Sequence, residues 1–224
     1  MNAHKEENKI KTNSKIAYDI IKNKILRCEY LPGQLLSEKE IVEELQMSRT
    51  PARQALNILA GENLISIISN KGIQITQISE KKVKEVTEIR VMLEKLMIEK
   101  AIDNITDKDL EMLDCLHEKL KNDLNRTDAL AIFEAGKNIH QFIADIADDE
   151  TLNTIIKILR NDSSRGYIYF LKNKFQRSSQ EQIRIIKDSL RTSHEDILHA
   201  LREKNKEKAV EAIARDVTIF KELI

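Results

Sequence analysis

Residues 32–75 read PGQLLSEKEIVEELQMSRTPARQALNILAGENLISIISNKGIQI, and this stretch decides the fold of the first third of the chain. Ser37 is followed three residues later by Glu40, the spacing of a capping box, which predicts the start of a short helix. Pro51 suits the first turn of a second helix that runs to about Gly61. So tight a connection between two helices is typical of a helix-turn-helix.

A β-hairpin is predicted directly after the second helix. Residues 64–78, LISIISNKGIQITQI, are rich in β-branched side chains, and the tripeptide Asn70-Lys71-Gly72 divides them into two short runs. This pattern indicates two strands with a turn at 69–72. A helix-turn-helix followed by a hairpin is a winged helix, in which the hairpin is the wing.

The segment before the helix-turn-helix completes the predicted domain. Apolar residues at helical intervals predict a helix over 15–28, and Pro32 and Gly33 force a turn after it. Residues 1–13 are polar, and we expect them to be disordered. The predicted winged helix-turn-helix domain therefore covers residues 14–78.

The remainder of the chain, residues 79–224, is predicted to be an all-helical bundle. Gly and Pro are scarce, with 5 and 2 in the whole chain, and no strong strand or turn signal follows residue 80. The sequence thus predicts a mostly α protein, a winged helix-turn-helix followed by a helical bundle. The periodicity indicates helices over 80–102, 107–124, 128–148, 150–173, 179–204 and 206–223.

Composition narrows the class of protein only slightly. The chain has 37 Lys and Arg against 37 Asp and Glu, so its bulk charge does not indicate a nucleic-acid partner. Cys28 and Cys115 fit no metal spacing, and reduced thiols in a cytoplasm are the simplest interpretation. The N-terminus has no apolar signal region and no segment approaches 18 uninterrupted apolar residues, so we expect a cytoplasmic protein without a membrane partner.

Two parts of the sequence resemble a known family. The stretch quoted above resembles the DNA-binding domain of the GntR family of regulators, which commonly reads PG-x-x-L-x-E-x-x-L-A, then Ser-Arg-Thr-Pro-x-Arg, then a wing ending in Arg-Gly or Lys-Gly. EIRVMLEKLMIEKA (88–101) and IHQFIADIADDETL (139–152) resemble two segments of the FCD ligand domain of the FadR-like branch. The resemblance implies a transcription regulator, usually a repressor, whose helical domain over 79–224 binds an effector and dimerises.

The candidate DNA contacts centre on two arginines. Arg49 and Arg53 are four residues apart, so they share a face of the second helix, at the end that would enter a major groove. Arginine is the side chain best suited to bidentate contact with guanine. The alternative is that both are ordinary solvated charges. With the resemblance added, the expected DNA-binding residues are Lys39, Ser48, Arg49, Thr50, Arg53, Lys71 and Gly72.

Four polar residues fall on the apolar faces of their own predicted helices: Arg90, His140, His194 and Asp216. Buried polar groups are costly unless they find partners, so four of them indicate an interior polar cavity. We expect Arg90 to bind the carboxylate of a small organic-acid effector, because its planar fork suits that group. The two histidines and Asp216 would hold a divalent ion or the effector's remaining polar groups.

The resemblance also implies a metal site, with departures. The FCD domain often holds a metal with Asp-x-x-x-His in one helix and one His in each of the last two helices. His140 and His194 match two of these positions, but Gly136 replaces the Asp and Asp216 replaces the last His. Two imidazoles and one carboxylate can still bind Zn²⁺, Mn²⁺ or Ni²⁺. A metal-free effector pocket and a set of satisfied core residues without any ligand are the alternatives.

The remaining candidates receive less specific roles. Glu88 and Glu94 could suggest acid–base chemistry, but we expect structural roles or solvated helix faces. His117 borders an apolar stripe and is expected at the edge of the core. His199 has charged helical neighbours and is expected to be solvated.

A ligand-responsive regulator is the favoured function, in the form of a homodimer that reads a short pseudo-palindrome in double-stranded DNA. One winged helix covers too few base pairs for adequate specificity, which is why a dimer is expected. One alternative is a constitutive DNA-binding protein whose helical domain only dimerises. Another is an enzyme, because two His and one carboxylate also form the facial triad of non-haem iron oxygenases. We do not expect catalysis, since those enzymes usually hold the triad on a β-barrel.

Overall fold

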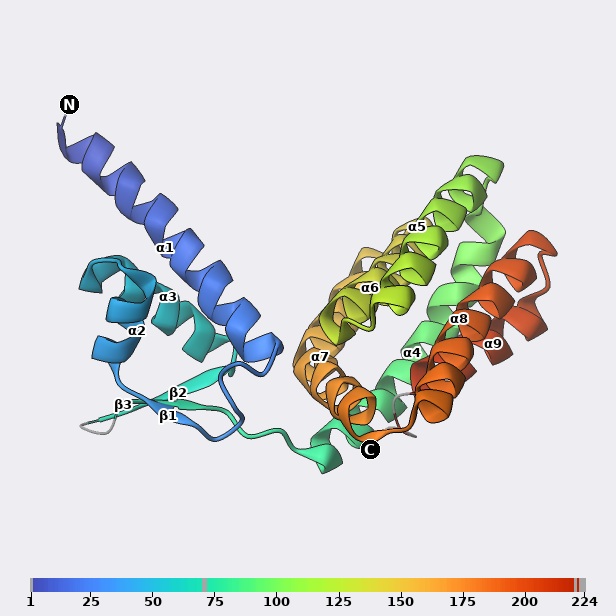
Figure 1. Cartoon of the computed structure of the whole chain (residues 1–224). Helices are drawn as coiled ribbons and strands as arrows, with labels where there is room; N and C mark the ends of the chain where they lie inside the picture. The colour runs from blue at the N-terminus through green and yellow to red at the C-terminus, as the bar shows by residue number, and fades with distance from the viewer. Residues whose placement is uncertain (1, 70–71, 220, 222–224) are drawn as a thin grey trace. The chain divides into compact units, whose positions relative to one another are not determined.

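The computed structural model describes residues 2–69, 72–219 and 221, with the backbone alone for residues 2–12. The chain divides into two compact units, Met1–Ile78 and Ser79–Ile224. Figure 1 shows a small sheet covered by helices in the first unit and a bundle of long helices in the second.

The first unit is a winged helix. Its elements are α1 (Asn2–Leu26), β1 (Leu35–Leu36), α2 (Glu38–Leu45), α3 (Arg49–Gly61), β2 (Ile65–Ile68) and β3 (Gly72–Ile75). Helices α2 and α3 form the predicted helix-turn-helix, and β2 and β3 pair antiparallel as the predicted hairpin. Strand β1 was not predicted; it pairs antiparallel with β3 and makes β3 the central strand. A strand of two residues is too short to give a period-2 signal.

Local hydrogen bonds set the ends of α2 and α3. The Ser37 hydroxyl accepts from the backbone N–H of Glu40 at 3.1 Å, and the Glu40 carboxylate accepts from the backbone N–H of Ser37 at 2.6 Å. Helix α2 ends at Gln46, whose φ of 51° lies in the left-handed region. Ser48 occupies the N-cap of α3, but its side chain makes no capping hydrogen bond within the described residues. The Ser48 hydroxyl is therefore available to another partner.

The core of this unit fixes the direction in which α3 faces. Helix α1 packs against α3, and the hairpin closes the core from the other side. With this side buried, the opposite face of α3 is exposed. The buried residues are Ala17, Ile21, Ile25, Tyr30, Ile41, Ala55, Leu56, Leu59, Ile65, Ile73 and Ile75.

Helix α1 is longer than the sequence analysis predicted. Residues 1–13 were expected to be disordered, whereas α1 begins at Asn2. Residues 2–13 contain Lys and Glu but no Gly or Pro, so nothing in their composition stops the helix. At its other end α1 stops at Leu26, because Cys28 adopts a positive φ of 53°.

The second unit is all-helical over its described residues, as predicted. Its helices are α4 (Glu80–Asn104), α5 (Asp107–Arg126), α6 (Ala129–Ile146), α7 (Glu150–Arg177), α8 (Gln180–Arg202) and α9 (Lys206–Ile219). The starts of α4 to α8 are fixed by side chains that accept a backbone N–H: Ser79, Thr106, Asp128, Asp149 and Ser179. None of the helices in the described part of the chain is long and apolar enough to cross a membrane.

The helices of the second unit share one core. Helix α4 packs against α6, α7 and α9, while α8 packs against α5 and α9. Ile139 of α6, Ile197 of α8 and Ile213 of α9 are completely buried. Polar residues on the same stripes must therefore project into the bundle interior.

Candidate functional site

The residues predicted to contact DNA lie at the surface, around the start of α3. Arg53 donates from Nε to the Glu38 carboxylate at 3.1 Å, which holds its side chain across the beginnings of α2 and α3. Lys39 on α2 is mostly exposed, with its Nζ 3.6 Å from the Glu43 carboxylate. Four of the predicted residues at the start of α3 are exposed: Ser48, Arg49, Thr50 and Arg53.

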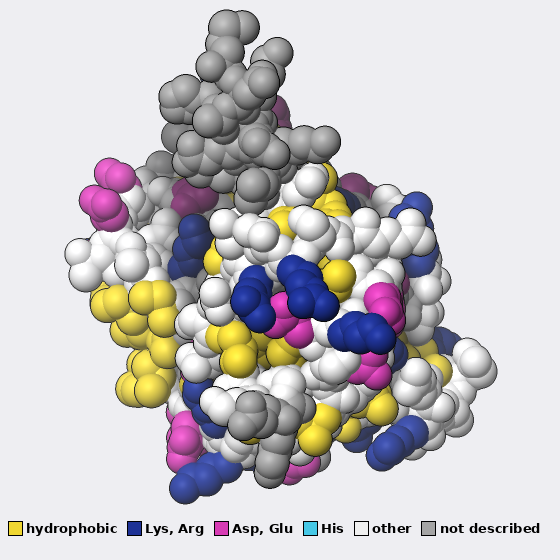
Figure 2. All heavy atoms as spheres, turned by 90° about the vertical axis from the view of Figure 1, so that its left-hand side faces the viewer, with side chains coloured by type: hydrophobic (Ala, Val, Ile, Leu, Met, Phe, Trp, Pro, Cys, Tyr) yellow, Lys and Arg dark blue, Asp and Glu magenta, His cyan; other side chains and the backbone are white. Residues whose placement is uncertain are grey.

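The two residues predicted to contact DNA from the wing are Lys71 and Gly72. Lys71 lies outside the described residues. Gly72 has a φ of 98°, and a Cβ at this position would lie 2.5 Å from the backbone oxygen of Leu36. Gly72 is therefore needed where β1 and β3 approach closely, a structural reason that the sequence analysis did not give. Figure 2 shows the molecule from the left-hand side of Figure 1. Lys and Arg side chains gather near the middle of this view, with Asp and Glu side chains beside them.

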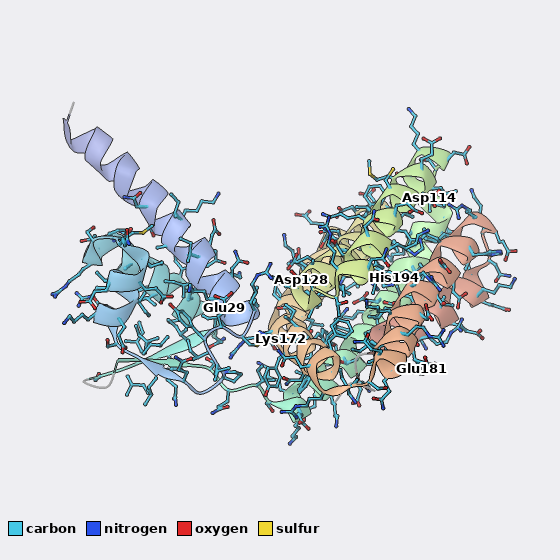
Figure 3. The ribbon with its side chains drawn as sticks, in the orientation of Figure 1. Glu29, Asp114, Asp128, Lys172, Glu181 and His194 are labelled. Carbon is cyan, nitrogen blue, oxygen red and sulfur yellow. The ribbon has the colours of Figure 1, made fainter. Side chains whose placement is uncertain are left out.

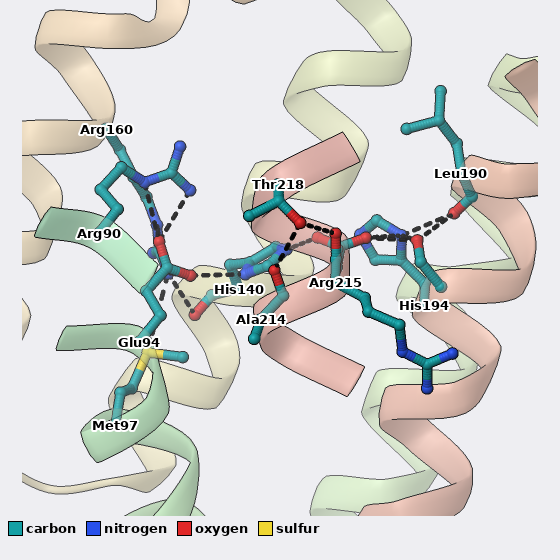
Figure 4. Close-up of polar contacts among 12 residues, drawn as sticks. Arg90, Glu94, Met97, His140, Arg160, Leu190, His194, Ala214, Arg215 and Thr218 are labelled. Carbon is teal, nitrogen blue, oxygen red and sulfur yellow. Dashed lines mark hydrogen bonds and ion pairs between the residues drawn. The ribbon is translucent and has the colours of Figure 1, made fainter. Parts of the chain in front are cut away.

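In the helical unit, a buried carboxylate gathers three positively charged or polar groups (Figure 4). Glu94 of α4 is fully buried and accepts from Arg90 Nε and Nη2 at 2.9 and 2.7 Å. Arg160 of α7 donates to the same carboxylate from Nε at 3.2 Å and from Nη2 at 2.8 Å. His140 Nδ1 of α6 lies 2.8 Å from Glu94 Oε2. Two nitrogens of Arg90, predicted to bind an effector, are thus engaged by an internal carboxylate.

The other three predicted residues meet beside this network. His140 Nε2 lies 2.7 Å from Asp216 Oδ2, and His194 Nδ1 lies 3.1 Å from Asp216 Oδ1. The two imidazole centroids are 5.5 Å apart. Ser193 donates its hydroxyl to Asp216 Oδ1 at 2.5 Å. The structure thus brings together side chains from α6, α8 and α9, and Figure 3 shows His194 inside the bundle.

One nitrogen of His194 is left without a partner. His194 Nδ1 lies 2.8 Å from the backbone oxygen of Leu190, which can only accept, so Nδ1 carries the proton. His194 Nε2 is then a bare lone pair, and it is buried without a hydrogen-bond partner among the described residues. A Cβ on Gly136 would lie 3.4 Å from this nitrogen. Glycine at this position therefore leaves open space beside Nε2.

A cavity of about 40 Å³ lies between these side chains. A site of this size holds a few water molecules, at roughly 10–15 Å³ each, or a small ligand. Arg160 Nη1 is a second buried atom without a partner in the described part of the chain. The cavity thus offers one unused donor and one unused acceptor. Its polar lining consists of Arg90, Lys137, His140, Arg160, Tyr167, His194 and Asp216.

The electrostatics of the cavity follow from burial and from the partners of each group. Burial alone would raise the pKa of Glu94, but Arg160 and Arg90 hold it well below its usual value. Burial opposes the charged form of His140, yet Glu94 and Asp216 outweigh it and raise its pKa. Burial lowers the pKa of His194, with Asp216 opposing it only in part. Burial is also outweighed at Asp216, where His194 and His140 lower the pKa to about 2.

The residues present fit a divalent metal ion in their chemistry. His140, His194 and Asp216 are buried, and each offers a ligand atom within 4.8 Å of the others. Imidazole and carboxylate are the ligands of Zn²⁺, Mn²⁺ and Ni²⁺ sites. The bare lone pair of His194 and the open space at Gly136 add to this fit. His140 departs from it, because both of its nitrogens face carboxylates and a metal would have to displace a proton.

Sequence reasoning did not place Glu94 in the network beside the cavity, and it did not identify Arg160 of the cavity lining. Glu94 lies four residues after Arg90 and four before buried Ile98, so the stripe rule applied to Arg90 would have found it. Arg160 lies four residues after buried Ile156. Both signals were present in the helical spacing.

The two histidines given minor roles occupy different environments. His199 is exposed, with Nδ1 3.5 Å from the Glu203 carboxylate, as expected for a solvated residue. His117 is buried more deeply than an edge residue, and burial lowers its pKa. It is not part of the cavity lining.

Comparisons with known proteins agree with the architecture. Residues 13–75 match the bacterial regulatory proteins of the gntR family, and residues 85–218 match the FCD domain. YdhC of Bacillus subtilis (strain 168), an uncharacterized HTH-type transcriptional regulator, is 26% identical over 193 residues, which cover 86% of this chain and 82% of YdhC. The gluconate operon transcriptional repressor of the same organism is 23% identical over 205 residues, which cover 92% of this chain and 82% of the repressor.

A solved structure extends the likeness to three dimensions. E. coli McbR/YncC superposes with a TM-score of 0.72 at 23% identity, covering 92% of this chain and 93% of that chain. At this identity the likeness concerns the fold. The FCD match alone spans more than half of the chain. This chain therefore belongs to the GntR family of transcription regulators, with an FCD domain behind its DNA-binding domain.

Proposed function

We propose that this regulator represses transcription and that a small organic-acid effector, bound inside the helical unit, modulates its binding to an operator. One observation carries the proposal: Arg90, His140, His194 and Asp216 line one buried cavity, in which His194 Nε2 has no partner among the described residues. Native proteins leave few buried polar atoms unpaired, so such an atom in a cavity is suited to a ligand. The relative named as a gluconate operon repressor supports repression as the sign of regulation.

The DNA-binding half of the proposal rests on the start of α3. Arg49 and Arg53 are exposed there and would contact guanines in a major groove, while Lys39 and Thr50 would contact phosphates or a base. Ser48 has a hydroxyl that is not used for capping within the described chain. The wing Lys71 would reach a minor groove or a phosphate. Two copies of the chain would read the two halves of a pseudo-palindrome.

The effector half rests on the unused atoms of the cavity. Glu94 engages Nε and Nη2 of Arg90, so Nη1 of Arg160, which has no partner among the described residues, joins Arg90 as the donor side for an effector carboxylate. At the other side, neutral His194 accepts at Nε2 from a hydroxyl or ammonium group of the effector, or binds a metal ion there. Ser193 and Leu190 hold Asp216 and His194 in orientation.

A divalent metal would be held by His140, His194 and Asp216. When bound, it would supply a Lewis-acid contact for an effector oxygen. Since His140 Nε2 faces Asp216 at 2.7 Å, binding would release a proton, and metal affinity would fall as the solution becomes more acidic. Gly136 contributes no ligand atom, which leaves a coordination position for the effector or for water.

The test is operator binding by the full chain, on a DNA sequence selected from a random pool. Fluorescence anisotropy is measured after chelator treatment, and again with Zn²⁺, Mn²⁺ or Ni²⁺ and with a panel of small carboxylic acids. We expect at least one addition to change the operator Kd about tenfold or more, the usual size of such a coupling. His194→Gln should remove this response, whereas His199→Gln, which changes an exposed histidine of the same helix, should retain it.

The alternatives give different results in the same experiment. Operator binding that is indifferent to every metal and acid would favour a constitutive DNA-binding protein. Conversion of one of the acids by the chain would indicate an enzyme. A response that survives in His194→Gln would move the effector site away from this cavity.

A further inference from the structure

The two arginines at the start of α3 differ in their contacts with the rest of the chain. Arg53 donates from Nε to Oε2 of Glu38 at 3.1 Å. Its terminal nitrogens, Nη1 and Nη2, have no partner among the described residues. Arg49 makes no hydrogen bond or ion pair at all within the described part of the chain. Arg53 is therefore held through one nitrogen and open at its end, whereas Arg49 is not held.

Glu38 occupies a position that suits it to hold another side chain. It is the first residue of α2, directly after the N-cap Ser37, and a carboxylate is stabilised there by the positive end of the helix. The side chain of Glu38 is 31% exposed, against 69% for that of Arg53. The carboxylate is thus the more buried partner, and the guanidinium is the more accessible one.

The hydrogen bond through Nε determines which edge of the guanidinium can meet a base. Guanine is recognised by two N–H groups that bind its O6 and N7 atoms together. The rigid guanidinium can offer such a pair from Nη1 and Nη2, or from Nε and one Nη nitrogen. Because Nε of Arg53 is bound to Glu38, the pair at the end of the side chain remains.

A side chain that is ordered before binding loses less entropy when it binds. Arginine has many rotamers, and fixing one of them lowers affinity unless it is already fixed in the free protein. An exposed ion pair adds little to stability, but its attraction strengthens where a partner excludes water. The contribution of Glu38 is therefore expected in recognition and not in the stability of the fold.

The negative charge of Glu38 acts on binding in a second way. Phosphates attract arginine at every DNA sequence, and a carboxylate beside Arg53 opposes this attraction. Specificity is a difference between affinities, so weaker binding to all sequences with an unchanged guanine contact increases it.

We propose that Glu38 is a positioning residue for operator recognition. Its carboxylate holds Arg53 through Nε so that Nη1 and Nη2 bind one guanine, and Glu38 itself contacts no base. This inference deepens the proposed function and rests on it, because it requires that Arg53 reads a base pair of the operator. Glu38 was not among the residues predicted from the sequence to contact DNA.

The test is operator binding by the full chain, measured by fluorescence anisotropy on the selected operator and on duplexes that each change one base pair. Arg53→Ala identifies the base pair that Arg53 reads, as the one at which discrimination is lost. Glu38→Ala should reduce discrimination at that same base pair about tenfold, a usual size for coupling between residues in contact. Glu38→Gln keeps an oxygen that accepts from Nε and should retain most of the discrimination. The base pair read by Arg49 should be unaffected in both variants.

Glu43→Ala is the matched control. It removes the same charge from an exposed position of α2 that lies near Lys39, so it should change only the overall affinity and leave discrimination at every base pair unaltered. On a random duplex, Glu38→Ala should steepen the dependence of log Kd on log salt by about 1, because Arg53 can then bind a phosphate. Circular dichroism checks that every variant is folded.

A double variant shows whether Glu38 acts through Arg53. Adding Glu38→Ala to Arg53→Ala should cause no further loss of discrimination. A further loss at another base pair would mean that Glu38 contacts a base itself, and this would overturn the proposal. Full discrimination in Glu38→Ala, or an equal loss in Glu43→Ala, would overturn it as well while leaving the proposed function intact. Full discrimination in Arg53→Ala would instead reject the contact of Arg53 with a base on which the proposed function depends.

Discussion

In the N-terminal unit, Arg49 and Arg53 project from the start of α3 at the surface, whereas Arg90 and Arg160 of the helical unit are buried against one carboxylate. The exposed pair of Arg53 with Glu38 is screened by solvent and contributes little to stability. The buried groups depend on each other, since an unpaired charge inside a protein is costly. Exposed charged side chains can therefore contact a partner molecule. Buried charged side chains bind each other, and only those of their atoms that lack a partner among the described residues can bind a ligand.

The most severe test of this contrast is Glu94→Gln. The substitution removes the charge that both buried guanidinium groups share, and we expect a loss of about 3–5 kcal/mol in the free energy of unfolding. Urea unfolding followed by circular dichroism measures it. Glu88→Gln, on the exposed side of the same helix, should change stability by no more than about 0.5 kcal/mol. Equal losses in both variants would erase the distinction between the two classes of charge.

The fold could be predicted from the sequence wherever the signal was local. The capping box of Ser37 and Glu40, the β-branched runs around the wing and the spacing of apolar residues after residue 80 each identified an element that the structure contains. Strand β1 escaped detection because its pairing with β3 depends on residues far apart in sequence. The predicted start of the first helix at residue 15 was wrong, because the polarity of residues 1–13 was taken as a sign of disorder, whereas α1 begins at Asn2.

The cavity could be predicted in part, because the position of a residue on a helix face is also a local signal. Each of Arg90, His140, His194 and Asp216 could be placed on an apolar stripe, but a stripe does not say which atoms will pair. The contact of Arg160 with Glu94 joins α7 to α4 and depends on how the helices pack. That packing also leaves His194 Nε2 without a partner in the described part of the chain, which helical spacing alone does not predict.

The second prediction concerns the exposed side of the comparison. Arg49→Ala and Arg53→Ala should each weaken specific operator binding by about 1–3 kcal/mol and relax discrimination between sequences. Lys39→Ala should weaken binding more evenly across sequences. Anisotropy titrations on operator and mutated operator measure both effects. Full sequence discrimination in both arginine variants would contradict the proposed placement of α3 in the major groove.

The third prediction uses the spare atoms of the cavity. Gly136→Asp would place a carboxylate beside His194, because a Cβ added at this position would lie 3.4 Å from Nε2. If the cavity holds a metal, the added ligand should raise Zn²⁺ affinity about tenfold, or 1.4 kcal/mol. Calorimetric titration of chelator-treated protein measures the affinity. Gly136→Leu, which adds bulk without a ligand atom, is the control, and equal Zn²⁺ affinity in the two variants would argue against a metal in this cavity.

The last prediction separates stability from recognition within two serines that occupy the same kind of position. Ser37 caps α2 through a 3.1 Å hydrogen bond, so Ser37→Ala should cost about 1 kcal/mol of stability. Ser48 caps α3 without such a bond among the described residues, so Ser48→Ala should cost clearly less in urea unfolding. If the free hydroxyl of Ser48 serves DNA, Ser48→Ala should instead weaken operator binding by about 0.5–1.5 kcal/mol, the worth of one hydrogen bond. If Ser48→Ala is as stable as the unaltered chain and binds the operator with the same affinity, Ser48 does not contact DNA, because its hydroxyl then contributes to neither stability nor operator binding.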